Sequence, residues 1–248
     1  GDFTIEYWAK TDFVQSPNVH GSPAAVMFDF REPGVGGSVS IYAGMYQNQA
    51  YFWVNDVRIP WDGNAIGSNF NDDAWHHFAL VRSGATVTLY IDGLSVGSIT
   101  DSGSIATSSD WRIGARFDVN ALHNSIESWQ GAMDDWRITK GVARYTDNFN
   151  RPEYTLPASG ANAWQTWRET SVTVEEPAPG PDITADLVAY YPFDGSYDDA
   201  SGNGHHGAAS SNTSLAAGKL GGGAHTPELE YVSIADSGHS DFEFGSND

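Results

Sequence analysis

The chain has 248 residues, of which 40% are hydrophobic and 13% aromatic, and its formal net charge is −20. This length and apolar content can bury a substantial core, whereas 32 acidic against 12 basic residues make nucleic acid an unsuitable partner. The absence of cysteine excludes disulfides, thiolate metal sites and cysteine nucleophiles, and no stretch approaches the roughly 20 apolar residues of a membrane span, so membrane insertion is not expected.

Strand patterns recur at short spacing from the start of the chain. Apolar and polar residues alternate over residues 3–7, which predicts a strand with one buried face. Further strands are predicted at 25–28, 38–42 and 50–54, because these segments are rich in aromatic and apolar residues and are separated by glycine, proline and asparagine.

The clearest segment is a meander of three strands between residues 75 and 99. Its strands, 75–82, 86–91 and 95–99, are separated by a Ser-Gly and an Asp-Gly dipeptide, which are typical of tight turns between antiparallel strands. Two further strands are predicted at 111–114 and 131–138.

Residues 158–185 differ in character and are predicted to form a linker. Prolines alternate with other residues between 177 and 181, which stiffens the chain toward an extended conformation. Trp164 and Trp167 lie in this linker, and two large aromatic side chains are expected to pack against a domain face rather than stay in water. We therefore predict that both are interface residues.

Three segments resemble the laminin-G-like, concanavalin-A-like jelly-roll family. Residues 75–93 contain Trp-His-His-Phe-Ala-Leu-Val-Arg-Ser-Gly and Leu-Tyr-Ile-Asp-Gly, and residues 129–145 are similar to the closing strand and tail of the family. Residues 187–207, with Tyr-Tyr-Pro-Phe-Asp-Gly and Ser-Gly-Asn-Gly-His-His-Gly, resemble the segment that normally opens such a domain. The resemblance implies an all-β fold, an antiparallel two-sheet jelly-roll sandwich with an extended Pro-rich linker.

The opening segment of this resemblance follows the closing one. We expect residues 1–157 to be the C-terminal major part of a LamG-like jelly roll, 158–185 to be the linker, and 186–248 to be N-terminal strands that complete the same or the next unit. Joined tail to head, the two parts make one continuous domain, which indicates a repeating polypeptide or a subunit that completes its neighbour, and we favour successive units. The residues predicted to meet at this junction are Leu187, Tyr190, Phe193, Phe3 and Ile5.

Calcium is the cofactor that the resemblance implies, because in similar jelly rolls a structural Ca²⁺ ties the opening segment to the closing strand. Turns rich in glycine and asparagine bring carboxylates and carbonyls together, which suits a hard cation with about 6–8 oxygen ligands. The alternative is that the aspartates only form Asx turns and cap strands. The predicted ligands are Asp194, Asp199, Gly202 and, because neighbouring strand residues face opposite sides, only one of Asp134 and Asp135.

Catalysis is not predicted. The sequence has neither a Gly-x-Ser-x-Gly elbow nor a His-Glu-x-x-His motif, and its carboxylates lack the i, i+2, i+4 spacing of glycosidases on related jelly rolls. The pairs His76-His77 and His205-His206 are neighbours that point apart on a strand, so neither pair is expected to chelate one metal.

Two functions remain open. The first is an extracellular structural or adhesive repeat unit, stabilised by calcium, that assembles with copies of itself or adjacent repeats into a fibre, stalk or giant adhesin by strand complementation or tandem repetition. The alternative is a carbohydrate-binding, lectin-like module of a surface adhesin or phage tail fibre, with cell-surface or matrix glycans as partners. The candidate glycan contacts are Trp61 and its neighbours Asp62 and Asn64.

Overall fold

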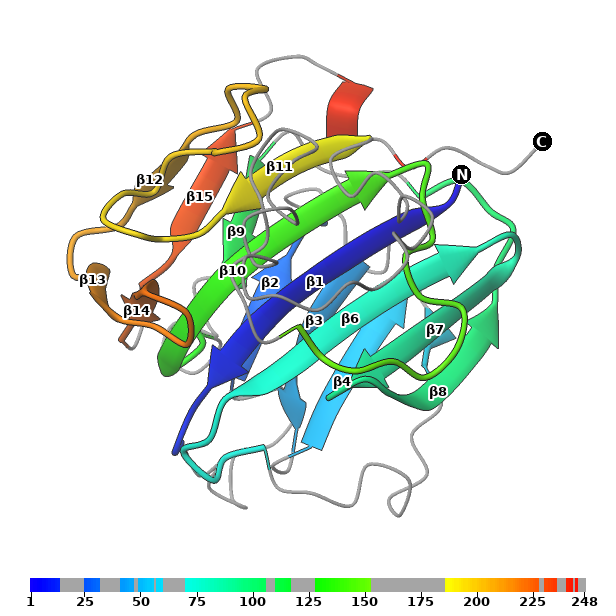
Figure 1. Cartoon of the computed structure of the whole chain (residues 1–248), viewed down its shortest axis with the longest axis horizontal. Coiled ribbons are helices and arrows are strands. Elements are labelled where there is room, and N and C mark those ends of the chain that lie inside the picture. The colour runs from blue at the N-terminus through cyan, green and yellow to red at the C-terminus, as the bar shows by residue number, and fades with distance from the viewer. Residues whose placement is uncertain are drawn as a thin grey trace, which may run out of the picture.

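Two antiparallel β-sheets packed face to face form a sandwich (Figure 1). The computed structural model describes residues 1–13, 25–31, 41–46, 49–55, 57–59, 70–105, 110–116, 128–152, 186–227, 230–235, 240–242 and 244. Within these residues the only helix is a 3-10 turn, η1 (Ser240–Phe242), and none is long and apolar enough to cross a membrane. The all-β antiparallel sandwich predicted from the sequence is confirmed, while the linker lies outside the described residues.

The first sheet has eight strands in the order β13-β14-β10-β1-β6-β7-β8, and β11 also pairs with β10. Its strands are β1 (Phe3–Lys10), β6 (His76–Ser83), β7 (Thr86–Ile91), β8 (Leu94–Thr100), β10 (Gly131–Lys140), β11 (Leu187–Tyr191), β13 (Ser214–Ala217) and β14 (Gly222–Thr226).

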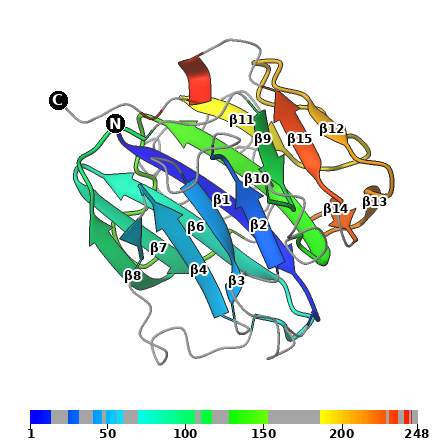
Figure 2. The ribbon, with the colours of Figure 1, turned by 180° about the vertical axis from the view of Figure 1, so that it is seen from behind.

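The second sheet has seven strands in the order β12-β15-β9-β2-β3-β4-β5 and is seen from its outer side in Figure 2. Its strands are β2 (Ala25–Asp29), β3 (Ile41–Tyr46), β4 (Gln49–Val54), β5 (Val57–Arg58), β9 (Asp110–Ile113), β12 (Gly207–Ala209) and β15 (Val232–Ala235).

The core lies between the sheets and follows the alternation of the sequence. On β1, Phe3, Ile5 and Tyr7 point into it, and Tyr7 stacks on Trp136 of β10 with ring centroids 4.2 Å apart. The predicted meander is also present, since β6 pairs with β7 and β7 with β8. Asp92 has a φ of 50° in the β7–β8 turn, which is a conformation that aspartate tolerates better than most residues.

The tail segment, residues 186–244, folds onto the first part of its own chain. β11 and β14 pair with β10, and β15 pairs with β9. The segment also completes the core, because Phe244 lies against Phe3 and Phe242 against Trp111, with centroid distances of 4.7 and 4.0 Å. The single chain therefore closes one sandwich in this structure. An exchange of the same pairings between successive units, which we favour from the sequence, stays a prediction.

The residues predicted at the junction fall into two groups. Phe3, Ile5 and Phe193 are completely buried in the core between the sheets. Leu187 and Tyr190 instead form a small separate cluster with Ala200. Trp164 and Trp167 lie outside the described residues.

A segment that we call the strap, residues 141–152, leaves β10 and crosses the outer face of the eight-stranded sheet (green loop in Figure 1). Tyr145 and Phe149 stack at 3.6 Å between ring centroids, and Phe149 packs on Tyr90 of β7. The Phe149 amide donates to the Gly93 carbonyl at 2.9 Å. The strap thus buries part of that face under the protein's own chain.

Candidate functional site

A β-bulge in β10 places two neighbouring aspartates on the same side of the sheet. Opposite β1, Glu6 pairs with Arg137 and Trp8 with Asp134, so one residue of β1 faces two residues of β10. Asp135 sits in the bulge with a φ of 49°. Met133 and Trp136 belong to the core, whereas both aspartates lie outside it. The alternation expected for an unbroken strand therefore fails here, and Asp134 and Asp135 both face outward.

The bulge lies where β10 changes partner. β11 pairs with residues 136–139 of β10, and β14 pairs with residues 131–133, so neither strand covers the two aspartates. The chain leaves β11 at Tyr191 and reaches Asp194 three residues later. The three carboxylates interact electrostatically with one another, since Asp194 raises the pKa of both other groups. They come from two segments more than 50 residues apart in sequence.

A glycine-rich turn before β14 holds two of these carboxylates. Asp134 Oδ2 accepts hydrogen bonds from the amides of Lys219 and Leu220 at 2.7 and 2.9 Å, and Asp194 Oδ1 accepts one from Gly222. Successive backbone amides of this kind make a concave site for anionic groups. The turn therefore ties β10, β14 and the end of β11 together.

Glycine is required at two positions of this turn. A Cβ on Gly218 would lie 2.6 Å from Asp134 Oδ2 and 2.0 Å from the Gly222 carbonyl oxygen. A Cβ on Gly221 would lie 2.2 Å from Asp194 Oδ1, and its φ of 135° is unfavourable for other residues. The carboxylates can approach the backbone this closely only because the side chains are missing.

Burial makes the pair of aspartates weak acids. Asp134 and Asp135 are 1% and 2% exposed, and burial is the largest cause that raises their pKa values, to about 6 for Asp134 and about 7 for Asp135. The neighbouring negative charges contribute in the same direction. The backbone amides that Asp134 accepts, and the Tyr190 hydroxyl that donates to Asp135 Oδ1 at 2.5 Å, partly offset this rise. Asp135 Oδ2 has no hydrogen-bond partner among the described residues.

Glu6 lies on the same outer face but behaves in the opposite way. Burial raises its pKa, but His77, Arg137 and Arg144 surround it at 3.4 to 3.9 Å, and together with the hydrogen bond to His77 they lower the pKa of Glu6 to about 2. Tyr145 of the strap also donates to Glu6 Oε2 at 2.6 Å. Glu6 is therefore an ionised carboxylate matched by cations, and this network anchors the strap.

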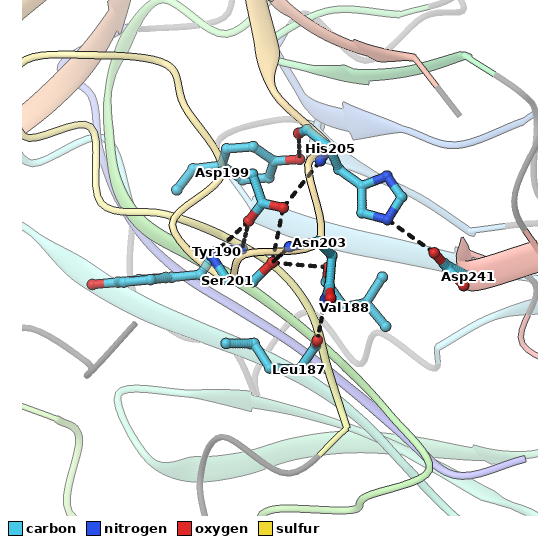
Figure 3. A network of polar contacts seen from close by, with 9 residues as sticks. Leu187, Val188, Tyr190, Asp199, Ser201, Asn203, His205 and Asp241 are labelled. Carbon is cyan, nitrogen blue, oxygen red and sulfur yellow. Dashed lines mark hydrogen bonds and ion pairs between the residues drawn. The ribbon is translucent and has the colours of Figure 1, made fainter. Parts of the chain in front are cut away.

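Asp199 takes part in a different network, which is drawn in Figure 3. Its Oδ1 accepts from the amides of Tyr190 and Ser201 at 3.0 and 2.9 Å, and its Oδ2 accepts from the Ser201 hydroxyl and the His205 amide at 2.8 and 3.1 Å. Both carboxylate oxygens are thus used to shape the turn that follows β11. These hydrogen bonds are those expected for the Asx-turn alternative, and Asp199 as a calcium ligand stays a prediction.

The structure therefore brings together three of the five predicted calcium ligands. Asp134, Asp135 and Asp194 gather at the bulge, whereas Asp199 and Gly202 belong to the turn after β11. Among the residues that the structure describes, no group of three or more histidine, aspartate or glutamate side chains has the geometry of a metal site. The candidate glycan contacts Trp61, Asp62 and Asn64 lie outside the described ranges.

The hydrogen-bond donors to Asp134 were not predicted from the sequence. The amides of Lys219 and Leu220 carry no signal of their own, although three consecutive glycines at 221–223 mark a close backbone approach. The prediction for His76-His77 agrees with the structure in that the two side chains point apart, toward Asp92 and Glu6 respectively.

A known protein family matches the sequence of this chain and has the fold described above. The sequence model of the concanavalin A-like lectin/glucanases superfamily, Laminin_G_3, matches residues 1–145. The comparison with curated proteins found no match.

Several solved structures resemble this chain. Domains LG4-5 of the mouse laminin α1 chain are 18% identical with a TM-score of 0.40, over 55% of this chain and 34% of theirs. A Bacteroides ovatus protein described as carbohydrate-binding is 11% identical with a TM-score of 0.48, over 99% of this chain and 56% of its own. This chain spans 34% and 56% of the lengths of these two structures. At these identities and TM-scores, the similarity is not evidence that the proteins share a function.

The raised pKa values predict that, without divalent metal, the protein loses stability as the pH rises from about 4 to 7. In that range folded Asp134 and Asp135 hold protons that the unfolded chain, with an ordinary pKa of 3.8, has released, so the free energy of unfolding falls. Asp135→Asn should raise this free energy at pH 8 by about 1 kcal/mol or more and flatten its pH dependence. Urea denaturation in chelator at pH 5 and 8 measures both.

The matched control is Asp198→Asn, which removes one charge from an exposed side chain in the tail segment. It should change stability by no more than about 0.5 kcal/mol at either pH. Equal stability of the unmodified protein at pH 5 and pH 8 would contradict this account of the bulge.

Proposed function

We propose that this chain, which belongs to the concanavalin A-like lectin/glucanases superfamily, is an extracellular, lectin-like adhesive module that binds glycans. The observation that carries the proposal is the family match over residues 1–145, together with a two-sheet sandwich that the tail segment completes. A fold of this kind hosts several functions, so the proposal depends on testing binding directly.

The burial of two carboxyl groups favours glycan binding over glycan hydrolysis. Hydrolysis of a glycosidic bond requires a pair of carboxyl groups that flank the substrate. In the described part of the chain, the carboxyl groups whose pKa values are raised are Asp134 and Asp135, and both are almost fully buried. A saccharide does not reach them, so we expect binding without turnover.

A glycan array tests the proposal. The intact protein should bind a subset of glycans, and titration calorimetry should give an affinity for the best of them, while incubation with that glycan should release no shorter product. Trp61→Ala should weaken binding if the loop predicted from the sequence contributes. An array without any bound glycan would overturn the proposed function.

We also propose that calcium stabilises the module at the bulge of β10. Asp134, Asp135 and Asp194 support this proposal, because the three carboxylates interact electrostatically and Asp135 Oδ2 has no hydrogen-bond partner among the described residues. Calcium would have to draw the three carboxylates together, since the described residues do not form a group with metal-site geometry without it. Carboxylate oxygens are the ligands that Ca²⁺ prefers. Asp134 already accepts three backbone amides, so the ion would compete with or supplement these hydrogen bonds.

Thermal melting at pH 8 with calcium or with chelator measures this effect. Calcium at about 100 times its Kd should add about 2.7 kcal/mol, which corresponds to roughly 5–10 °C in Tm for a chain of this size. Asp135→Asn should lose most of this response, and Asp198→Asn should keep it. Identical melting curves with calcium and with chelator would contradict the proposal.

A second candidate function is assembly by strand exchange. The observation that favours it is that the tail segment supplies both strands on one edge of β10. A tail segment from a second copy would make the same pairings, as in domain swapping and strand complementation. Repeated exchange would produce a chain of units of the kind predicted from the sequence.

Single cysteines test exchange cleanly, because the chain has none of its own. Ala132 and His225 are register partners on β10 and β14, at a spacing that permits a disulfide. When the Ala132→Cys and His225→Cys proteins are unfolded together, refolded and oxidised, exchange should give a covalent heterodimer on a non-reducing gel. A gel without that dimer, with an intramolecular disulfide in the double variant, would exclude exchange.

A further inference from the structure

β8 is an edge strand without the usual protection against pairing with another chain. It ends the eight-stranded sheet (Figure 1) and has seven residues, whereas β13, β12 and β5, which end the two sheets at their other edges, have four, three and two. Its sequence contains neither a charged residue nor a proline. Shortness, charge and proline are three devices by which natural edge strands avoid pairing with other chains, and β8 has none of them.

The second half of β8 turns backbone groups outward. Asp101, directly after the strand, donates its amide to the Ala85 carbonyl at 2.7 Å, on the side of β7. Because inward and outward groups alternate along an antiparallel strand, the amides and carbonyls of Ser98 and Thr100 point away from β7. Ile99 belongs to the core, so the side chains of Ser98 and Thr100 project from the outer face, where both are exposed.

The beginning of β8 is closed to pairing. The register between β7 and β8 shifts at Tyr90 and Ser95, which bends the strand there. The Ser95 amide donates to the side chain of Asn148 in the strap at 2.9 Å. The open part of the strand is therefore residues 96–100, which we call the β8 edge. In the part of the chain that the structure describes, no strand pairs with it.

Two exposed apolar side chains lie at opposite ends of this edge. Leu94 and Val57 are 58% and 46% exposed and are the large apolar side chains with high exposure among the described residues. Leu94 begins β8. Val57 lies two residues after Asn55, whose amide group donates to Asp101 at 2.6 Å, so it belongs to the end at which β8 stops.

A second copy of the chain fits this arrangement. Antiparallel pairing of the β8 edge with the same edge of another copy is symmetric about a two-fold axis, and each copy then uses one self-complementary patch. With Ser98 at the axis, Leu94 of one copy comes to the end of the other copy at which Val57 lies. The exposed apolar side chains of the two copies are thus brought together at both ends of the paired strands.

Charge also favours this edge as the contact between copies. The net charge of −20 makes two copies repel each other at long range, whereas β8 places no charge at the contact itself. Salt screens repulsion between exposed charges. Association through the β8 edge is therefore expected to strengthen as the salt concentration rises.

We propose that two copies of this chain associate reversibly through the β8 edge, which joins their eight-stranded sheets into one continuous antiparallel sheet. The contact consists of main-chain hydrogen bonds, with Leu94 and Val57 packing beside them. It is small, so we expect a Kd of about 1–100 µM. This inference rests neither on glycan binding nor on calcium, and it differs from strand exchange because no segment leaves its own sandwich.

Sedimentation velocity of the intact protein, at several protein concentrations and at low and high salt, tests the proposal. A rapid monomer–dimer equilibrium should appear, with more dimer at high salt. Ser98→Lys sets two positive charges opposite each other at the axis and should weaken the dimer at least about 10-fold. The matched control is Ser214→Lys, which adds the same charge at an exposed position of the opposite edge strand β13 and should leave the dimer unchanged.

A cysteine at the axis gives an independent readout, because the chain has none of its own. The Ser98→Cys protein should form a covalent dimer on mild oxidation, since residues directly opposed across two strands are spaced for a disulfide. The Ser214→Cys protein should not. Thermal melting checks that each variant is folded, and all four substitutions are at exposed positions.

Each outcome decides the proposal. Protein that stays monomeric at about 1 mM in high salt, or a dimer that is equally strong in Ser98→Lys, would overturn it. A dimer that persists on dilution and cross-links through Ala132→Cys and His225→Cys would point to strand exchange instead and would equally overturn it. A dimer that dissociates on dilution, is lost in Ser98→Lys and cross-links at Ser98→Cys would support it.

Discussion

The double pairing of β10 is the interaction on which the rest of the structure depends. One edge of β10 bonds to β1 along most of its length, and the other edge is shared by β11 and β14 from the tail segment. Without these two strands β10 would expose a long row of unpaired amides and carbonyls in the middle of the sheet. The tail segment also supplies core residues such as Phe193 and Phe242, so neither part of the chain has a complete core alone.

Two buried carboxylates differ in ionisation because their neighbours differ. Glu6 and Asp135 lie on the same outer face and are almost equally inaccessible to water. The hydrogen bond to His77 and the nearby Arg137 and Arg144 lower the pKa of Glu6 and hold it ionised. Asp135 has no such cation, and burial together with its acidic neighbours raises its pKa to about 7. The two sites lie on the neighbouring strands β1 and β10, and the protons that the fold holds near neutral pH lie at the bulge.

Much of the fold follows from local pattern. Alternation over 3–7 and the Asp-Gly turn after β7 predict strands and turns that the structure contains, because both signals depend on only a few adjacent residues. The β10 bulge was not predictable, since an aspartate with positive φ leaves no mark in composition and reverses the facing of its neighbours. The amides that hold Asp134 were missed because backbone donors leave no side-chain signal and lie more than 80 residues away in sequence.

The strap limits which face of the eight-stranded sheet is open to other molecules. By stacking Tyr145 and Phe149 on the eight-stranded sheet and joining Tyr145 to Glu6, the chain occupies part of that face with its own side chains. A ligand approaching there would first have to displace aromatic packing and a buried ion network. The two outer faces of the sandwich are therefore chemically different, because the strap covers part of one of them.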